Sequence, residues 1–173
     1  MKLLELLKTV TTFVFDVDGV LTDGSLLILP NGVMARKMNV KDGYALQLAV
    51  KKGYRVVVIS GGNSEEVQDR LNKLGVSAVF MKVTDKVKVL SDYVESQKLS
   101  WTELLFMGDD IPDLEVMRKV GVASCPFDAV QEIKEVSAYI SPLNGGFGCG
   151  RDVIEKVMKL RGDWNEDTQV SST

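Results

Sequence analysis

The chain has 173 residues, of which 21 are basic and 24 acidic, and its formal net charge is −3. That length suits one domain burying roughly 70% of its unfolded surface, and that charge supplies no basic field for nucleic acid or an anionic membrane, so we expect neither partner. The absence of histidine excludes Ser-His-Asp and Cys-His catalysis and leaves acid–base chemistry to carboxylates, lysine or tyrosine.

The first ten residues, MKLLELLKTV, predict a helix that leads into the domain. Glu5 and Lys8 interrupt the apolar run and no small-residue cleavage site follows, which argues against a signal peptide. No apolar run approaches the roughly 20 residues that span a membrane. Two cysteines, Cys125 and Cys149, are too few and too far apart for a zinc site or a disulfide framework, so a reducing cytoplasm fits best.

The next run, TTFVFDVDGVLTDG, ends at Gly24 and is the part around which the chain is organised. Its apolar β-branched and aromatic residues predict a buried strand that delivers Asp16 and Asp18 at its carboxyl end. Two carboxylates this close repel each other, so the placement costs stability unless a cation or a reaction needs them. An acidic strand end in solvent is the simpler explanation for one aspartate, but the full pattern favours Mg²⁺, which prefers hard oxygen ligands.

After this run, Leu26 to Leu29 and Val33 to Met38 flank the turn Pro30-Asn31-Gly32, which predicts a protruding β-hairpin. Helical and strand patterns then alternate to the end of the domain. We expect helices over 39–53, 64–75, 85–97, 108–121, 129–135 and 150–160, and strands over 55–59, 76–81, 103–107, 122–124 and 138–140. This order predicts an α/β fold, a three-layer Rossmann-like parallel sheet, with ligands at the carboxyl ends of its strands.

The last thirteen residues, 161–173, form a polar tail after a single domain over residues 1–160, and Trp164 is the large apolar side chain in it. Two interpretations stay open. The tail is disordered, or it docks on a partner subunit.

Polar side chains follow the predicted strands at their carboxyl ends, where they should converge. They form the set that phosphoryl transfer needs, namely a nucleophile, a metal site and donors for phosphate oxygens: Asp16, Asp18, Ser60, Gly61, Lys86, Asp109, Asp110 and Asp113. Asp16 is the expected nucleophile, Asp109 completes the metal ligands, and the Ser60 hydroxyl suits an anion at a helix start. Singly, each has a simpler explanation as a helix cap, a solvated lysine or an acidic first turn.

The pattern resembles the haloacid dehalogenase superfamily of aspartyl-phosphate hydrolases. DVDGVLTDG is similar to its first motif, ISG to its second, Lys86 to its third and GDDIPD to its fourth. The resemblance extends to about Lys159, because NVKDGYALQLAVKKG, SEEVQDRLNKLGV and NGGFGCGRDVIEKVM resemble the 3-deoxy-D-manno-octulosonate 8-phosphate phosphatases and their nonulosonate 9-phosphate relatives.

The resemblance implies a Mg²⁺-dependent phosphatase for a small acidic sugar phosphate in lipopolysaccharide biosynthesis. Asp16 would form a phosphoaspartyl intermediate, and Asp18 would protonate the leaving sugar oxygen and then activate water. It implies a metal held by Asp16, the Asp18 carbonyl and Asp109, with Asp110 acting through a metal-bound water and Asp113 orienting Lys86.

The resemblance also implies how the pocket is closed. Only about forty residues separate Asp18 from Ser60, too few for the cap domain of larger superfamily members. The subgroup closes its site by forming a homotetramer through its hairpins. Because Leu26 to Leu29 is unusually apolar for an exposed hairpin, we expect it at a subunit contact, with packing on its own domain as the alternative.

One departure concerns the substrate. After ISG, where the octulosonate enzymes usually carry Arg and the nonulosonate relatives Glu or another long polar residue, this chain has Gly62-Asn63. Candidates for contacting the substrate, each with surface solvation as the alternative, are Arg36, Lys41, Asn63 and Arg151.

Three other functions fit parts of the pattern. A phosphate-receiving signalling domain also clusters Asp, a hydroxyl and Lys around Mg²⁺, but its phosphorylated Asp comes on a later strand than its acidic pair. A non-catalytic regulatory protein is disfavoured because every expected catalytic group is present. A phosphomutase of the same superfamily would need the missing cap.

Overall fold

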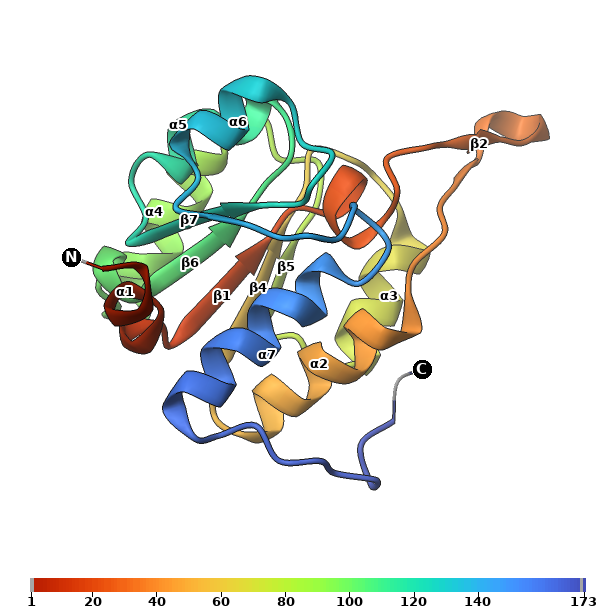
Figure 1. The fold of residues 1–173 in the computed structure, drawn as a ribbon. Coiled ribbons are helices and arrows are strands. Elements are labelled where there is room, and N and C mark those ends of the chain that lie inside the picture. Colours follow the sequence, from red (N-terminus) through yellow and green to blue (C-terminus); the bar gives the residue numbers. More distant parts are fainter. Residues whose placement is uncertain (1, 172) are drawn as a thin grey trace.

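Six parallel strands form the central sheet of the computed structural model, which describes residues 2–171 and 173 (Figure 1). Their order across the sheet is β5-β4-β1-β6-β7-β8, so the first strand lies between β4 and β6. The strand bounds are β1 Thr12–Phe15, β4 Arg55–Ile59, β5 Ala78–Phe80, β6 Leu104–Met107, β7 Val122–Cys125 and β8 Tyr139–Ile140. The α/β prediction is confirmed, with ends shifted by a few residues.

Helices cover both faces of this sheet. On one face lie α1 (Leu3–Thr9), α2 (Val40–Lys51), α3 (Glu65–Lys73) and α7 (Cys149–Arg161). On the other lie α4 (Lys86–Ser96), α5 (Leu114–Met117) and α6 (Gln131–Val136). Among the residues that the structure describes, no helix is long and apolar enough to cross a membrane.

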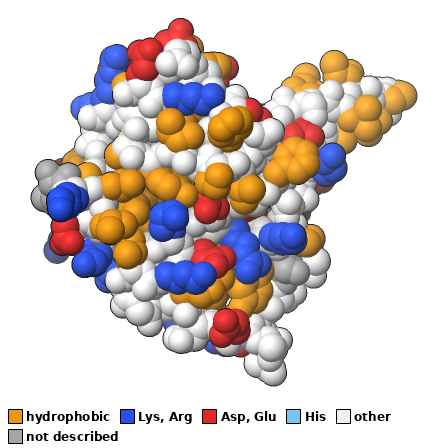
Figure 2. Space-filling view, viewed as in Figure 1, with side chains coloured by type: hydrophobic (Ala, Val, Ile, Leu, Met, Phe, Trp, Pro, Cys, Tyr) orange, Lys and Arg blue, Asp and Glu red, His pale blue; other side chains and the backbone are white. Residues whose placement is uncertain are grey.

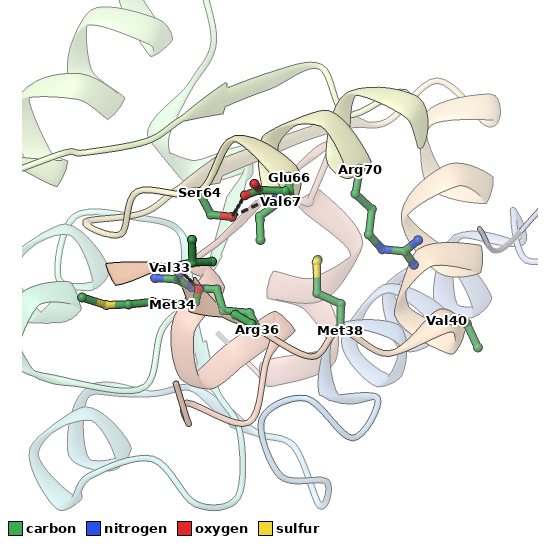
Figure 3. Close-up of a pocket in the computed structure, with 10 residues that line it drawn as sticks. Val33, Met34, Arg36, Met38, Val40, Ser64, Glu66, Val67 and Arg70 are labelled. Carbon is green, nitrogen blue, oxygen red and sulfur yellow. Dashed lines mark hydrogen bonds between the residues drawn. The ribbon is translucent and has the colours of Figure 1, made fainter. Parts of the chain in front are cut away.

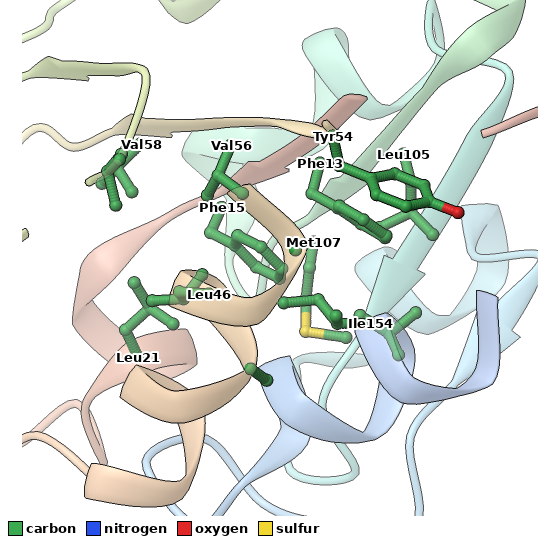
Figure 4. Packing of buried hydrophobic residues seen from close by; sticks show 14 of the residues in the cluster. Phe13, Phe15, Leu21, Leu46, Tyr54, Val56, Val58, Leu105, Met107 and Ile154 are labelled. Atoms are coloured by element: carbon green, nitrogen blue, oxygen red, sulfur yellow. The ribbon is translucent and has the colours of Figure 1, made fainter. Parts of the chain in front are cut away.

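The first strand supplies side chains to both cores. Phe13 and Phe15 are fully buried among residues of α2 and α7, where Figure 4 shows them beside Leu46 and Ile154. Val14 points to the opposite core, since successive side chains of a strand alternate between faces. Burial on both faces fixes the register of β1, and with it the position of the aspartates that follow.

The segment after GDD departs from prediction. One helix was expected to reach Gly121, but a 3₁₀ turn covers Ile111–Asp113 and α5 spans only Leu114–Met117. Pro112 explains the tight start, because a proline disfavours helical geometry at the residue before it and donates no backbone N–H.

The hairpin projects from the domain (Figure 1) and consists of β2 (Leu27–Ile28) and β3 (Met34–Ala35) around a turn over Pro30–Gly32. Its strands are shorter than the apolar runs that predicted them. Leu27 and Ile28 are 65% and 73% exposed, and Figure 2 shows apolar side chains gathered along this arm. The alternative that the hairpin packs on its own domain is therefore wrong within the single chain.

Over its described residues the tail packs on α2 and α7 of its own chain, which neither interpretation anticipated, and docking on a partner subunit stays a prediction. The Trp164 ring lies edge-on to Tyr44, with 6.2 Å between ring centroids. Asp167 accepts a hydrogen bond from Lys51 at 2.6 Å, and its backbone N–H donates to the Tyr44 hydroxyl at 3.0 Å. The contact between Trp164 and the half-buried Tyr44 orders the segment. The polar composition of the tail does not reveal this pairing.

Candidate active site

The carboxyl ends of three neighbouring strands bring the predicted polar groups together. Asp16 follows β1, Ser60 follows β4, and Asp109 lies two residues after β6. The backbone N–H of Asp16 still donates to Met107 of β6 at 3.1 Å, which holds the first aspartate in line with the sheet. These ends enclose a hollow of about 350 Å³ whose lining includes Asp16, Asp18, Ser60, Gly61, Lys86 and Asp109.

Gly19 allows the first loop to reach Asp109. It adopts a φ of 85°, which favours glycine, inside the turn Val17–Leu21. A Cβ at this position would lie 1.9 Å from Asp109 Oδ2, far inside contact distance. Gly19 therefore allows both the turn and the close approach of the two acidic loops.

Lys86 lies between two carboxylates at the start of α4. Its Nζ is 2.6 Å from Asp113 Oδ1 and 3.1 Å from Asp16 Oδ2, and the residue is 7% exposed. Asp113 Oδ2 accepts a hydrogen bond from the backbone N–H of Asp109 at 3.1 Å. Both oxygens of Asp113 are therefore occupied in positioning its neighbours, the geometry expected of a residue that orients Lys86.

Burial and crowding disfavour the charged carboxylates. Burial, with the charge of Asp113 added to it, raises the pKa of Asp16 to about 7, although Lys86 opposes the shift. Burial together with the charges of Asp16 and Asp113 raises the pKa of Asp109 to about 8. Burial alone would lower the pKa of Lys86, but Asp16 and Asp113 outweigh it and raise that pKa. The site holds more negative charge than its lysine balances.

A divalent cation fits this excess. One carboxylate oxygen from each of Asp16, Asp109 and Asp113 lies within 4.8 Å of the other two. Asp109 Oδ1 is buried and has no hydrogen-bond partner among the described residues. An unpaired buried oxygen costs free energy, and binding a metal ion would remove that cost. Because Asp113 is occupied, Asp16 and Asp109 are the carboxylates best placed to ligate.

Two predicted metal-site residues turn their side chains elsewhere. The Asp18 carboxylate accepts hydrogen bonds from Arg36 Nε and Nη2 at 2.7 and 3.1 Å. Asp110 lines the hollow, but its side chain accepts a hydrogen bond from the Ile111 N–H and the residue is exposed. These positions leave the Asp18 carbonyl and a water-mediated role for Asp110 as the expected contributions.

The expected phosphate-binding groups surround the same hollow. Ser60 is 1% exposed, and its Oγ accepts a hydrogen bond from the Gly62 N–H at 3.1 Å, which leaves its hydroxyl proton available. Gly61 and Lys86 line the opening beside it. A hydroxyl, a backbone amide and an ammonium group at one opening suit the oxygens of a phosphate.

The four candidate substrate contacts divide into two places. Arg36 and Asn63 line a second hollow of about 580 Å³ that shares Asp18 and Gly62 with the first. Lys41 and Arg151 line a separate hollow of about 640 Å³ that shares no residue with the first. The structure therefore does not bring these two to the acidic cluster.

Arg151 already has partners of its own. Its Nε donates to Glu155 at 3.2 Å, and its guanidinium lies over the rings of Tyr44 and Trp164. Its backbone N–H donates to the buried Asp42 carboxylate at 2.7 Å. These contacts tie α7 to α2 and the tail, so they give Arg151 a structural role.

Sequence reasoning missed two side-chain contacts, one at the site and one away from it. The pairing of Arg36 with Asp18 depends on how the hairpin returns to the sheet, which residue spacing does not reveal. The buried Asp42, whose pKa burial raises to about 6, accepts the hydrogen bond from the start of α7. Asp42 belongs to the DGY segment that the sequence analysis singled out, but the sequence pattern does not indicate that its partner is the start of α7.

Known proteins are similar to this chain in sequence and in fold, although no protein-family model matches the chain. The chain is 30% identical over 159 residues to the 3-deoxy-D-manno-octulosonate 8-phosphate phosphatase of Escherichia coli (strain K12), covering 92% of this chain and 85% of that protein.

Solved structures agree with this relationship. The Moraxella catarrhalis 3-deoxy-D-manno-octulosonate 8-phosphate phosphatase, crystallised with magnesium, phosphate and KDO, is 28% identical with a TM-score of 0.90, covering 93% of this chain and 92% of that one. A Legionella pneumophila hydrolase of the HAD superfamily (subfamily III A) is 29% identical with a TM-score of 0.89, covering 92% and 88%. Because it is 30% identical to such an enzyme over 92% of its own residues, the chain belongs to the 3-deoxy-D-manno-octulosonate 8-phosphate phosphatase family of the haloacid dehalogenase superfamily, and is a phosphoric monoester hydrolase.

Proposed function

We propose that this protein is a cytoplasmic, Mg²⁺-dependent phosphatase that hydrolyses a small acidic sugar phosphate through a phosphoaspartyl intermediate on Asp16. The substrate class is 3-deoxy-D-manno-octulosonate 8-phosphate or a related nonulosonate 9-phosphate. The observation that carries the proposal is the buried contact of Asp16, Lys86 and Asp113 beside the unpartnered oxygen of Asp109. The names of the relatives and structural neighbours support the substrate class.

In the first half-reaction, an Asp16 carboxylate oxygen forms a bond to phosphorus as the bond between phosphorus and the sugar oxygen breaks. Lys86, the Ser60 hydroxyl and the Gly61 N–H hold the phosphate oxygens during this transfer. Asp18 gives its proton to the departing sugar oxygen, which leaves as a hydroxyl group.

In the second half-reaction, Asp18 takes a proton from water as that water attacks phosphorus. The bond between phosphorus and the Asp16 oxygen breaks, which releases inorganic phosphate and restores the carboxylate. A bound Mg²⁺, held by Asp16, Asp109 and the Asp18 carbonyl, would supply positive charge that screens carboxylate from phosphate.

A turnover screen tests the reaction and the substrate together. We expect phosphate release from 3-deoxy-D-manno-octulosonate 8-phosphate or a nonulosonate 9-phosphate to exceed that from glucose 6-phosphate in kcat/KM, and to stop when EDTA removes divalent cations. Equal turnover of simple sugar phosphates would contradict the substrate class. Full activity in EDTA would contradict the cation requirement.

The raised carboxylate pKa values predict how stability depends on pH. Both Asp16 and Asp109 move up from an ordinary value of 3.8, so the cation-free folded protein binds more protons than the unfolded chain between that value and about pH 8. Its free energy of unfolding should therefore fall as pH rises through this range. Because Mg²⁺ binds ionised carboxylates, the stabilisation that it provides at a fixed concentration should grow with pH. At a Mg²⁺ concentration of a hundred times Kd, it should add about 2.7 kcal/mol to the free energy of unfolding.

Thermal unfolding at several pH values, with and without Mg²⁺, measures both trends. Asp109→Asn should reduce the Mg²⁺-induced rise in Tm. An effect of Mg²⁺ that does not change between about pH 5 and pH 8 would contradict the assignment.

We further propose that the protein is a homotetramer in which the hairpins associate. The support is the exposed apolar strand Leu27–Ile28 on a projecting arm, since exposed apolar patches of this kind mark interaction sites. A neighbouring subunit would restrict access to the open hollow at the sheet edge.

Charged substitutions in the hairpin test this assembly. Leu27→Asp combined with Ile28→Asp should convert the tetramer to smaller species, because burying an unpaired charge costs several kcal/mol. Size-exclusion chromatography with light scattering measures the mass. Leu4→Asp, at a leucine on α1 that is 54% exposed, is the matched control and should leave the mass unchanged. A double variant that stays tetrameric would exclude the hairpin as the contact.

A further inference from the structure

Two hollows meet at the candidate site, and they differ in what they can hold. The inner one, of about 350 Å³, contains Asp16, Ser60 and Lys86, whereas the outer one, of about 580 Å³, lies between the hairpin and the start of α3. Asp18 and Gly62 line both. With phosphorus at Asp16 and the leaving oxygen beside Asp18, the leaving group must extend into the outer hollow.

Arg36 lines the outer hollow and places its guanidinium where the two hollows meet. Its Nε and Nη2 donate to the two oxygens of Asp18 at 2.7 and 3.1 Å, and its Nη1 donates to the Met34 carbonyl at 3.0 Å. The side chain is 5% exposed, so these bonds fix its position. One N–H on each of Nη1 and Nη2 has no protein acceptor among residues 2–171 and 173.

Gly62 makes the space for this guanidinium. A Cβ added there would lie 2.8 Å from Arg36 Nη2 and 2.9 Å from Asp18 Oδ2. Gly62 does not adopt a positive φ, so an alanine would not strain the backbone. The atoms in conflict are the ends of two side chains, which would move apart. The cost of a side chain at residue 62 therefore falls on the Arg36–Asp18 pair and not on the fold.

The surroundings of Arg36 combine apolar walls with charged side chains, among them Glu66 and Arg70. Figure 3 shows Val33, Met34, Met38 and Val67 around an adjoining hollow of about 450 Å³, with the Arg36 side chain beside Val33 and Met34. Without the guanidinium, the charged groups that line the outer hollow would be the carboxylates of Asp18, Glu65 and Glu66, which repel an acidic leaving group. A fixed planar cation with free N–H donors favours leaving groups that carry hydroxyl or carboxylate oxygens.

We propose that Gly62 and Arg36 form one specificity element, in which the missing side chain at residue 62 admits the Arg36 guanidinium and that guanidinium selects oxygen-rich leaving groups. This inference rests on the proposed phosphatase function and adds to it the residues that select the substrate. It would let the chain select its substrate although residue 62 has no side chain to reach the sugar. The cation comes from the hairpin instead.

A double-mutant cycle tests the coupling. The measured quantity is the ratio of kcat/KM for 3-deoxy-D-manno-octulosonate 8-phosphate to kcat/KM for p-nitrophenyl phosphate, whose leaving group has no sugar hydroxyls or carboxylate. Arg36→Ala should lower this ratio at least about tenfold, mainly through KM for the sugar phosphate. Gly62→Ala should lower it similarly, and the double variant should be no worse than either single variant within about twofold.

Control variants separate specificity from stability. Arg118→Ala, at an exposed arginine paired with Glu115, should leave the ratio unchanged. Gly62→Ala should also keep the Tm of the parent within a few degrees, because the backbone accepts alanine. Losses that multiply in the double variant, or equal losses for both substrates, would overturn the coupling.

A crystal structure of Gly62→Ala keeps this test independent of the proposed function. The guanidinium of Arg36 should be displaced from Asp18, and an unchanged pair would overturn the inference even in an inactive protein. If the parent protein hydrolyses neither probe with Mg²⁺, the proposed function fails, while the displacement still decides whether Gly62 makes room for Arg36.

Discussion

Asp16→Asn should abolish phosphate release while the protein stays folded. The amide keeps the shape of the carboxylate, so the hydrogen bond that Oδ1 accepts from the Val17 N–H at 2.7 Å can persist. It lacks the charge and nucleophilicity needed to attack phosphorus. We expect kcat to fall by about 10⁴-fold or more, the scale seen when a covalent nucleophile is lost. Steady-state assays with a coupled phosphate readout measure this loss.

The fold is checked separately from the activity. Removing a buried charge whose pKa is already raised to about 7 relieves repulsion with Asp113, so the variant should unfold at the same temperature as the parent or higher. Asp92→Asn, at an exposed aspartate paired with Lys88, is the matched control and should retain full activity. An Asp16→Asn protein that still shows Mg²⁺-dependent turnover would remove Asp16 as the nucleophile.

Lys86→Ala should be nearly as damaging and should also affect stability. Its ammonium group contacts Asp16 and Asp113, and all three residues are buried. Removing one such preorganised donor costs about 10²- to 10³-fold in kcat. Loss of the cation also leaves two buried carboxylates without their counter-charge, and breaking a buried pair costs about 3–5 kcal/mol where the remaining charge is not relieved.

The two effects of Lys86→Ala respond differently to Mg²⁺. Saturating Mg²⁺ should recover part of the lost Tm, because a cation at Asp16 and Asp109 offsets negative charge, but it should not restore kcat. Lys88→Ala is the control for both readouts, because Lys88 lies two residues after Lys86 on α4 and its side chain is exposed. A Lys86→Ala enzyme with parental kcat would exclude the lysine from phosphate binding.

Much of this architecture follows from local patterns. Strand β4 has the bounds that its apolar run predicts, and Ser64 caps α3 by accepting a hydrogen bond from the Val67 N–H. Burial on both sheet faces makes such strands continuous apolar runs, and glycines and capping residues mark where helices begin and end. Because carboxyl ends of parallel strands share one edge, the convergence of Asp16 and Asp109 could also be expected.

Other features required the structure because they depend on side chains distant in sequence. Asp18 and Arg36 meet only because the hairpin returns at the bridge between Thr22 and Met38. The same holds for the tail, where Trp164 finds Tyr44 across the surface of α2. Spacing along the chain predicts which edge a residue occupies, but not which partner its side chain chooses there.

Acid quenching of a single turnover tests the central claim most directly. The protein is mixed with Mg²⁺ and a radiolabelled sugar acid phosphate, stopped with acid within milliseconds, and digested so that the labelled peptide can be identified by mass spectrometry. We expect label attached to the peptide that contains Asp16, present during turnover and gone once the substrate is consumed. Inorganic phosphate released at the full rate with no label on Asp16 at any time would contradict the account.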